Sequence, residues 1–158
     1  MNWEAIGAIA EGLGAAGVIA SLLYVANQVR ANTRASRVEA KLQSTRFLGE
    51  MVDMLIQDPA LNELFRKGRA DLEALEGPDF YRFSNMLLKA FWFFSAQHFQ
   101  FRLGTLAESE WEEVNAPIHY YLSGPGVQAW WSSLGRASFG PEFRDFIDAE
   151  IAEMEARE

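Results

Sequence analysis

The run of residues 6–26 contains one charged side chain, Glu11, in 21 positions. As an α-helix with a rise of about 1.5 Å per residue it would be about 31 Å long, close to the hydrocarbon thickness of a bilayer. Many of its residues are glycine or alanine, and glycine weakens a helix in water but is common in membrane helices. We therefore predict a transmembrane helix within residues 1–28. The alternative is a buried helix of a soluble protein.

Basic side chains follow this run and none precedes it. The positive-inside rule then places the amino terminus outside an inner (cytoplasmic) membrane and the remainder of the chain in the cytoplasm. The first residues lack the basic segment of a cleaved signal peptide, so we expect the run to be retained. The side chains that set this orientation, or that also bind lipid headgroups, are Arg30, Arg34, Arg37 and Lys41.

The rest of the chain has a helical pattern. No glycine or proline separates Gly17 from Gly49, which predicts that the span continues unbroken into a stalk at residues 29–57. Residues 58–158 are expected to form a cytoplasmic helical domain, because large aromatic side chains there supply a core. The predicted fold class is all-α: one N-terminal transmembrane helix that continues into a stalk, followed by a cytoplasmic helical bundle.

Capping residues divide this domain into helices. Asp58 is placed to cap a short helix with Pro59 at its first position. After a connection at residues 75–79, an aromatic helix over residues 80–102 is expected to be central, and Gly104 to end it. Residues 105–108 read Thr-Leu-Ala-Glu, which has the spacing of a capping box for the next helix.

Proline and glycine mark the remaining boundaries. Pro117 is expected to kink or interrupt its helix. A turn at residues 124–126 precedes a helix over residues 127–134, and Pro141 opens a last helix. The apolar side of that last helix consists of Phe143, Phe146, Ile147, Ile151 and Met154.

Small residues recur every four positions in the predicted span, a spacing that lets two membrane helices approach closely. The steps from Ala20 to Ala31 and from Ala31 to Leu42 are eleven residues each, so they return to nearly the same helix face. This pattern predicts contact with a partner helix. The predicted packing face consists of Ala8, Gly12, Ala16, Ala20, Ala31 and Ala35.

Glu11 lies close to this face, at a depth where a carboxylate is costly. Three interpretations stay open. Glu11 is protonated and hydrogen-bonded to another helix, it lines a hydrated path, or it extends toward the outer surface.

The sequence contains no catalytic motif. Without cysteine there is no thiol nucleophile or thiolate metal site, and only His98 and His119 supply imidazole. We interpret His98 as a hydrogen-bonded core residue of the aromatic helix, and no spacing around His119 predicts a metal site. Residues 124–126 read Gly-Pro-Gly, which is turn chemistry and no phosphate loop. We therefore predict no enzyme activity and no cofactor.

The net charge of the carboxyl-terminal part of the chain limits which classes of ligand it can bind. Residues 104–158 carry 3 basic and 11 acidic side chains, which accounts for the whole net charge of -8. Such a surface disfavours nucleic acid and anionic lipid as ligands of this part.

Two pairs of adjacent aromatic residues, Trp130-Trp131 and Tyr120-Tyr121, lie in this acidic part. Neighbours on a helix point about 100° apart, so we expect one member of each pair to be buried and the other to be partly exposed. A position in the core is favoured over contact with a membrane or a partner.

The amino-terminal residues resemble a known family. The matching positions are Trp3, Glu4, Ala5, Ile6, Gly7, Glu11, Gly14, residues 21–26, residues 28–30 and residues 32–34. Together they are similar to the signature of a widespread family of small, single-span bacterial membrane proteins of unknown function. The resemblance covers about the first 37 residues. It implies a single span and carries no activity.

These observations predict a bitopic inner-membrane protein that acts through assembly. The first hypothesis is a homo-oligomer, pore-like or scaffolding, whose spans pack along the face described above. The alternative is an accessory subunit of a larger membrane complex that uses the same face against helices of another protein. Membrane lipid is a partner in both cases, and nucleic acid in neither.

Overall fold

The computed structural model describes the backbone of residues 3–157 and, within that range, every side chain except those of residues 3–10, 13 and 15. Six α-helices and one short 3-10 helix follow one another in this part of the chain, without a strand. The predicted all-α class is confirmed, with 86% of residues helical. The chain divides into two compact units, Met1–Met51 and Val52–Glu158, and each is described by itself.

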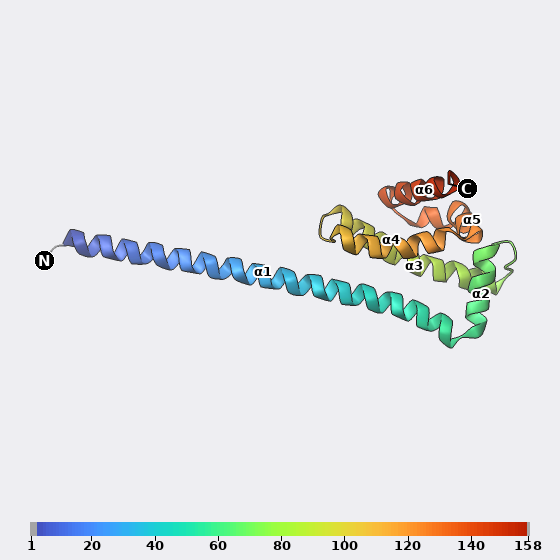
Figure 1. Ribbon diagram of the computed structural model, residues 1–158, viewed down its shortest axis with the longest axis horizontal. Helices are drawn as coiled ribbons and strands as arrows, with labels where there is room; N and C mark the ends of the chain where they lie inside the picture. Colours follow the sequence, from blue (N-terminus) through green and yellow to red (C-terminus); the bar gives the residue numbers. More distant parts are fainter. Residues whose placement is uncertain (1–2, 158) are drawn as a thin grey trace. The chain divides into compact units, whose positions relative to one another are not determined.

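Helix α1 (Trp3–Gln57) is one uninterrupted helix of 55 residues (Figure 1). It passes through Gly49 without a break, as the absence of proline and of a capping residue predicts. The helix ends where Asp58 leaves helical geometry and caps the helix that follows. The predicted continuity of residues 17–49 is therefore confirmed.

Helix α2 (Pro59–Ala70) begins as the sequence predicts. Asp58 Oδ1 accepts hydrogen bonds from the backbone nitrogens of Ala60, at 3.0 Å, and Leu61, at 3.1 Å. Pro59 has no N–H to satisfy in this first turn, so it fits there without cost. Leu64 and Phe65 are buried, which anchors α2 to the bundle.

Helix α3 (Pro78–Arg102) is the central element and packs against α2, α4 and α6. Its buried side includes Phe83, Leu87, Phe91 and Phe94, each exposed by 1% or less. Gly104 follows with a φ of +69°, in the left-handed region that glycine adopts without strain. The predicted end of the aromatic helix at this glycine is confirmed.

Helix α4 (Glu108–Leu122) corrects two predictions. The helix begins at Glu108 itself, and Glu110 Oε2 accepts from the backbone nitrogen of Ala107 at 2.9 Å, so the capping box predicted for residues 105–108 is wrong. Thr105 Oγ1 donates instead to the Gln100 carbonyl at the end of α3, at 2.9 Å. The helix also continues through Pro117, because one missing N–H removes only one of its backbone bonds, so the predicted interruption is wrong and the predicted kink stays a prediction.

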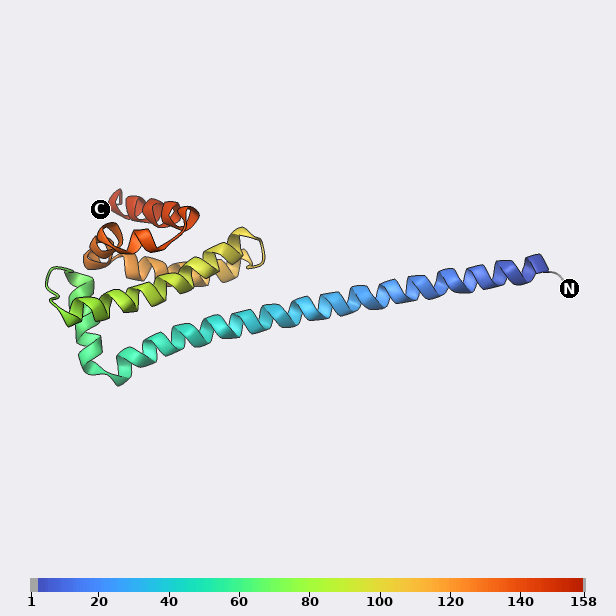
Figure 2. The same ribbon diagram turned by 180° about the vertical axis from the view of Figure 1, so that it is seen from behind.

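The last third of the chain folds back onto α3. Helix α5 (Pro125–Ser133) and the 3-10 helix η1 (Gly135–Ser138), which the sequence did not predict, lead into α6 (Pro141–Glu155), as Figure 2 shows from behind. In α6 Phe143 and Ile147 are buried, which confirms the apolar side at its centre. Pro141 occupies its predicted place in the first turn.

The adjacent aromatic pairs behave differently from each other. Trp130 and Trp131 are exposed by only 0% and 1%, so the expected split between a buried and an exposed ring is wrong for them. The short helix α5 contacts α2, α4 and η1, so both indoles meet other elements. The tyrosine pair confirms the expectation, because Tyr120 is exposed by 57% while Tyr121 packs its ring 5.6 Å from those of Phe65 and Phe94. Burial raises the pKa of Tyr121 to about 12.

Candidate functional site

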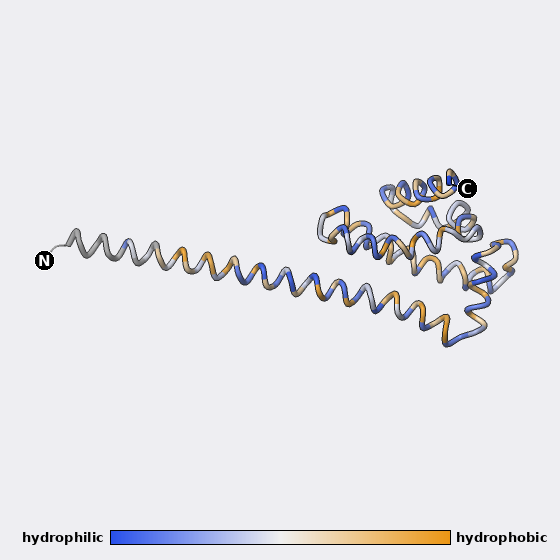
Figure 3. Tube along the Cα trace, viewed as in Figure 1, coloured by the Kyte–Doolittle hydropathy of each residue, from blue (hydrophilic) through white to orange (hydrophobic). Residues whose placement is uncertain are grey.

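The most unusual surface of the described chain lies on α1. Large apolar side chains of residues 18–25 are exposed by 54–63%, and their spacing places them within about 160° of one another around the helix. Figure 3 shows this stretch as a hydrophobic band followed by a hydrophilic one. An exposed apolar surface of this extent needs a covering of protein or lipid. The members of this band are Val18, Ile19, Leu22, Leu23 and Val25.

The predicted packing face can be located in part. Gly12, Ala16 and Ala20 are exposed, and each step of four residues turns about 40° around the helix. A Cβ atom added at Gly12 would meet nothing within 4 Å, so the helix surface there is open to a neighbour. The side chain of Ala8 lies outside the described residues. Ala31 and Ala35 are exposed further along the same helix.

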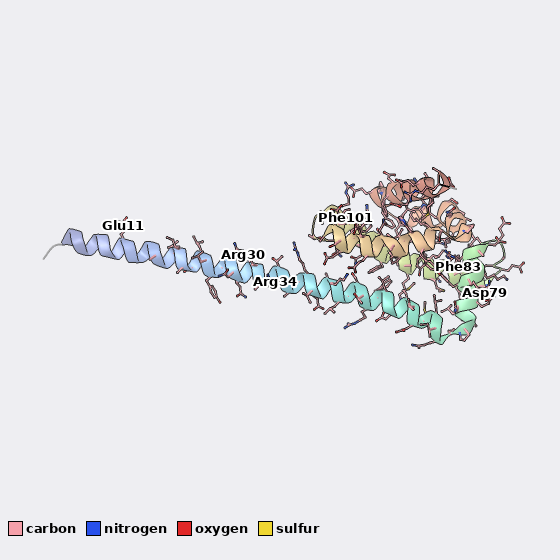
Figure 4. All side chains as sticks on the ribbon, viewed as in Figure 1. Glu11, Arg30, Arg34, Asp79, Phe83 and Phe101 are labelled. Atoms are coloured by element: carbon pink, nitrogen blue, oxygen red, sulfur yellow. The ribbon has the colours of Figure 1, made fainter. Side chains whose placement is uncertain are left out.

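Glu11 is exposed on α1 (Figure 4). It is adjacent in sequence to Gly12 and therefore about 100° from it around the helix. The carboxylate thus lies beside the packing face and not within it. This position is compatible with contact to a second helix, and the three interpretations of Glu11 remain predictions.

The basic side chains that follow the apolar band lie along one side of α1. Arg30, Arg34, Arg37 and Lys41 are separated by four, three and four residues, which places all of them within about 60° of one another on α1. Figure 4 shows Arg30 and Arg34 extending from the helix. Ala31 lies about 100° around the helix from Arg30, so the basic side chains lie beside the packing face. The shared helix face follows from the sequence spacing alone.

Among the described side chains, no α-helix combines the length and the apolarity that crossing a bilayer demands. The first part of the predicted span, residues 6–10 together with Leu13 and Ala15, falls outside those side chains. The transmembrane helix within residues 1–28 therefore remains a prediction.

In the bundle, His98 is a core residue, as expected. It is exposed by 7%, and its ring stacks on Phe146 at 4.6 Å and lies 5.6 Å from that of Trp111. Burial, with a smaller contribution from the Arg102 charge, lowers the pKa of His98 below its usual 6.5. A neutral imidazole inside an aromatic cluster fits packing better than catalysis.

His119 has a structural partner. Its Nε2 lies 2.6 Å from Glu150 Oε2 on α6 and 3.3 Å from Asn115 Nδ2 on its own helix. Asn115 precedes His119 by one helical turn, whereas Glu150 is distant along the chain and only the fold brings it near. Among the described residues, no group of three or more His, Asp or Glu side chains is arranged to hold a metal ion.

A cleft of about 520 Å³ lies between α5 and α6. Its polar walls are already paired: Asp148 accepts from Trp131 Nε1 at 2.9 Å and forms an ion pair with Arg136 at 2.9 Å. These contacts hold the two helices together. They leave no assembled set of acid, base and nucleophile in the cleft.

Comparison with family models, curated proteins and solved structures found no match. The family resemblance of the amino-terminal signature therefore stays a prediction.

Proposed function

We propose that the chain is a bitopic inner-membrane protein that self-assembles through α1 and acts without catalysis. Its amino terminus would lie outside, and the bundle of α2 to α6 in the cytoplasm. Lipid and the α1 helices of further copies are the partners in this proposal.

The observation that carries the proposal is the exposed apolar band of residues 18–25. In water such a band would be unfavourable by roughly 25 cal/mol for each Å² of apolar surface, and no described side chain of α1 covers it. Lipid covers such exposed apolar side chains without needing a specific partner. The basic side chains that begin at Arg30 follow the apolar band directly, as expected at the cytoplasmic end of a membrane span.

Assembly is supported by the open packing face. Between membrane helices there is no hydrophobic driving force, so association depends on close backbone approach at small residues. Gly12, Ala16 and Ala20 offer such an approach, and Ala31 and Ala35 continue as small exposed residues into the polar part of α1, where lipid does not explain them.

The mass of the full chain in detergent tests the proposal. A single, defined oligomer of the protein expressed alone supports self-assembly. A dispersed monomer contradicts it and favours the accessory subunit of a larger membrane complex. A protein that stays in solution as a monomer without detergent would contradict the span as well.

A matched pair of variants tests the packing face itself. Gly12→Leu and Gly14→Leu add the same bulk, and at both positions an added Cβ meets nothing within 4 Å in the isolated chain. Gly14 lies about 160° around the helix from Gly12 and about 120° from Ala20, on the other side of this part of the span. We expect Gly12→Leu to shift the mass toward monomer and Gly14→Leu to leave it unchanged. Equal effects would show that another face mediates assembly.

A further inference from the structure

Helix α3 and the beginning of α6 border another cleft of the bundle, of about 450 Å³. This volume lies in the range of small-molecule sites. Its lining comes from the bundle alone and includes Ser95, His98 and Phe99 of α3 with Gly140, Glu142 and Phe143 at the start of α6.

The polar side chain that distinguishes this cleft is His98. It is exposed by only 7%, yet none of the described residues forms a hydrogen bond with either ring nitrogen, so the hydrogen bond expected of this core residue is missing. Among the described side chains, the buried polar atoms without a partner are Asn115 Oδ1 and Arg144 Nε, which means that solvent still reaches the nitrogens of His98. Because the ring lines the cleft, a ligand there can complete its hydrogen bonding.

The start of α6 supplies hydrogen-bond donors to the same cleft. Gly140 is the N-cap residue and has no side chain with which to cap the helix. The backbone N–H groups of Glu142 and Phe143 lie in the first turn, where an α-helix offers them no acceptor of its own. The cleft therefore presents N–H donors together with an imidazole, which in its neutral form also has one accepting nitrogen.

Aromatic rings form the apolar part of the lining. Phe99 is exposed by 58%, and Phe143 is buried with its ring centroid 5.8 Å from that of His98. Rings of this kind pack favourably against a flat aromatic ligand.

The charges near the imidazole oppose each other. Burial has the largest effect on the pKa of His98 and lowers it, the Arg102 charge lowers it further, and the Glu142 charge raises it. An anion in the cleft would be repelled by the Glu142 carboxylate, whereas a cation would be repelled by Arg102 and by the positive end of the α6 dipole. A ligand without net charge avoids both penalties.

We propose that this cleft binds a small uncharged aromatic molecule that carries a hydroxyl group, of which phenol is the simplest. The hydroxyl donates to the imidazole of His98, its oxygen accepts from a backbone N–H at the start of α6, and the ring packs on Phe99 and Phe143. This inference goes beyond the function proposed above and does not depend on it, because the lining residues belong to the bundle and not to α1.

The chain has two histidines, which allows a direct test on the full-length protein. Labelled with carbon-13 at histidine Cε1 and purified in detergent at neutral pH, the protein gives one ring signal for His98 and one for His119, which does not line the cleft. Phenol is the probe, with its free concentration corrected for uptake by the micelles. Toluene, benzoate and benzylammonium keep the ring and change the polar group.

We expect phenol to shift the His98 signal saturably and to leave the His119 signal in place. Toluene should bind several-fold more weakly because it lacks the hydroxyl, and both charged analogues should also bind more weakly than phenol. Phe99→Ala should weaken phenol binding several-fold. Trp92→Ala removes an equally exposed ring of α3 that does not line the cleft, and it should leave the affinity unchanged.

A His98 signal that does not move, or that moves together with the His119 signal, overturns the inference. Equal affinities for phenol and toluene, tighter binding of a charged analogue, or equal effects of the two ring-removing variants overturn it as well. Failure here is distinct from failure of the proposed assembly, because this readout is a ring signal inside the bundle and the other is the mass of the particle.

Discussion

His119 on α4 and Glu150 on α6 are joined by a contact of 2.6 Å between Nε2 and Oε2. Their side chains are exposed by 41% and 19%, so solvent screens this pair less than an open surface pair. Glu150 lies within about 40° of Phe143 and Phe146 around α6, so the contact adds a polar link on the side of the helix that packs on the bundle.

Removing this pair should loosen α6. We expect Glu150→Ala to lower the free energy of unfolding by up to about 1 kcal/mol, the upper range for partly exposed pairs. The matched control is Glu153→Ala, which breaks an exposed pair with Arg157 on the same helix and should change stability by a few tenths of a kcal/mol. Urea unfolding of the full chain in detergent, followed by tryptophan fluorescence, measures both. Equal losses would show that the His119 contact has no special weight.

His98 should make the stability of the bundle depend on pH. Because burial lowers its native pKa below 6.5, the unfolded chain takes up a proton at a higher pH than the native protein. Its contribution is thus complete above about pH 6.5 and is lost as the pH falls toward the lower native value. We expect His98→Phe, which keeps an aromatic ring against Phe146, to remove this part of the pH dependence. Urea midpoints between pH 5 and pH 8 test it, and an unchanged slope would contradict it.

Gly126 should tolerate no side chain. A Cβ there would overlap the Gly68 carbonyl oxygen and lie 2.9 Å from the Leu72 nitrogen, so backbone atoms of α2 and α5 would have to separate. We expect Gly126→Ala to destabilise the bundle by about 1–3 kcal/mol, the range for overpacking. At Gly140 an added Cβ meets nothing within 4 Å, which makes Gly140→Ala the control. Similar unfolding midpoints for both variants would show that α2 and α5 can move apart freely.

Glu11 should influence assembly if the proposed contact between α1 helices is correct. We expect Glu11→Leu to change the oligomer mass in detergent or the ion flux through reconstituted vesicles, because a carboxylate at this depth needs a protein or water partner. Glu11→Gln keeps hydrogen bonding without charge and distinguishes the two effects. Unchanged mass and unchanged flux would leave only extension toward the outer membrane surface.

The sequence by itself determined where most helices begin and end. Asp58, Gly104 and Pro141 act through backbone geometry and hydrogen bonds within a few residues, so their roles were readable without any tertiary contact. The continuity of α1 and the all-α class follow from the same local signals. The exception was α4, where the Thr105 hydroxyl could accept from backbone N–H groups of the next helix or donate to a carbonyl at the end of α3, and the fold selected the second.

Only the tertiary structure decided which faces are covered. Sequence spacing places Trp130 and Trp131 about 100° apart, but it does not say that elements lie on both sides of α5 and bury both rings. It makes α3 aromatic all round, but not which of its rings stay exposed. The pairing of His119 with Glu150 likewise joins residues that are distant along the chain. Burial and long-range pairing depend on the placement of other helices, and that information is not local to any segment.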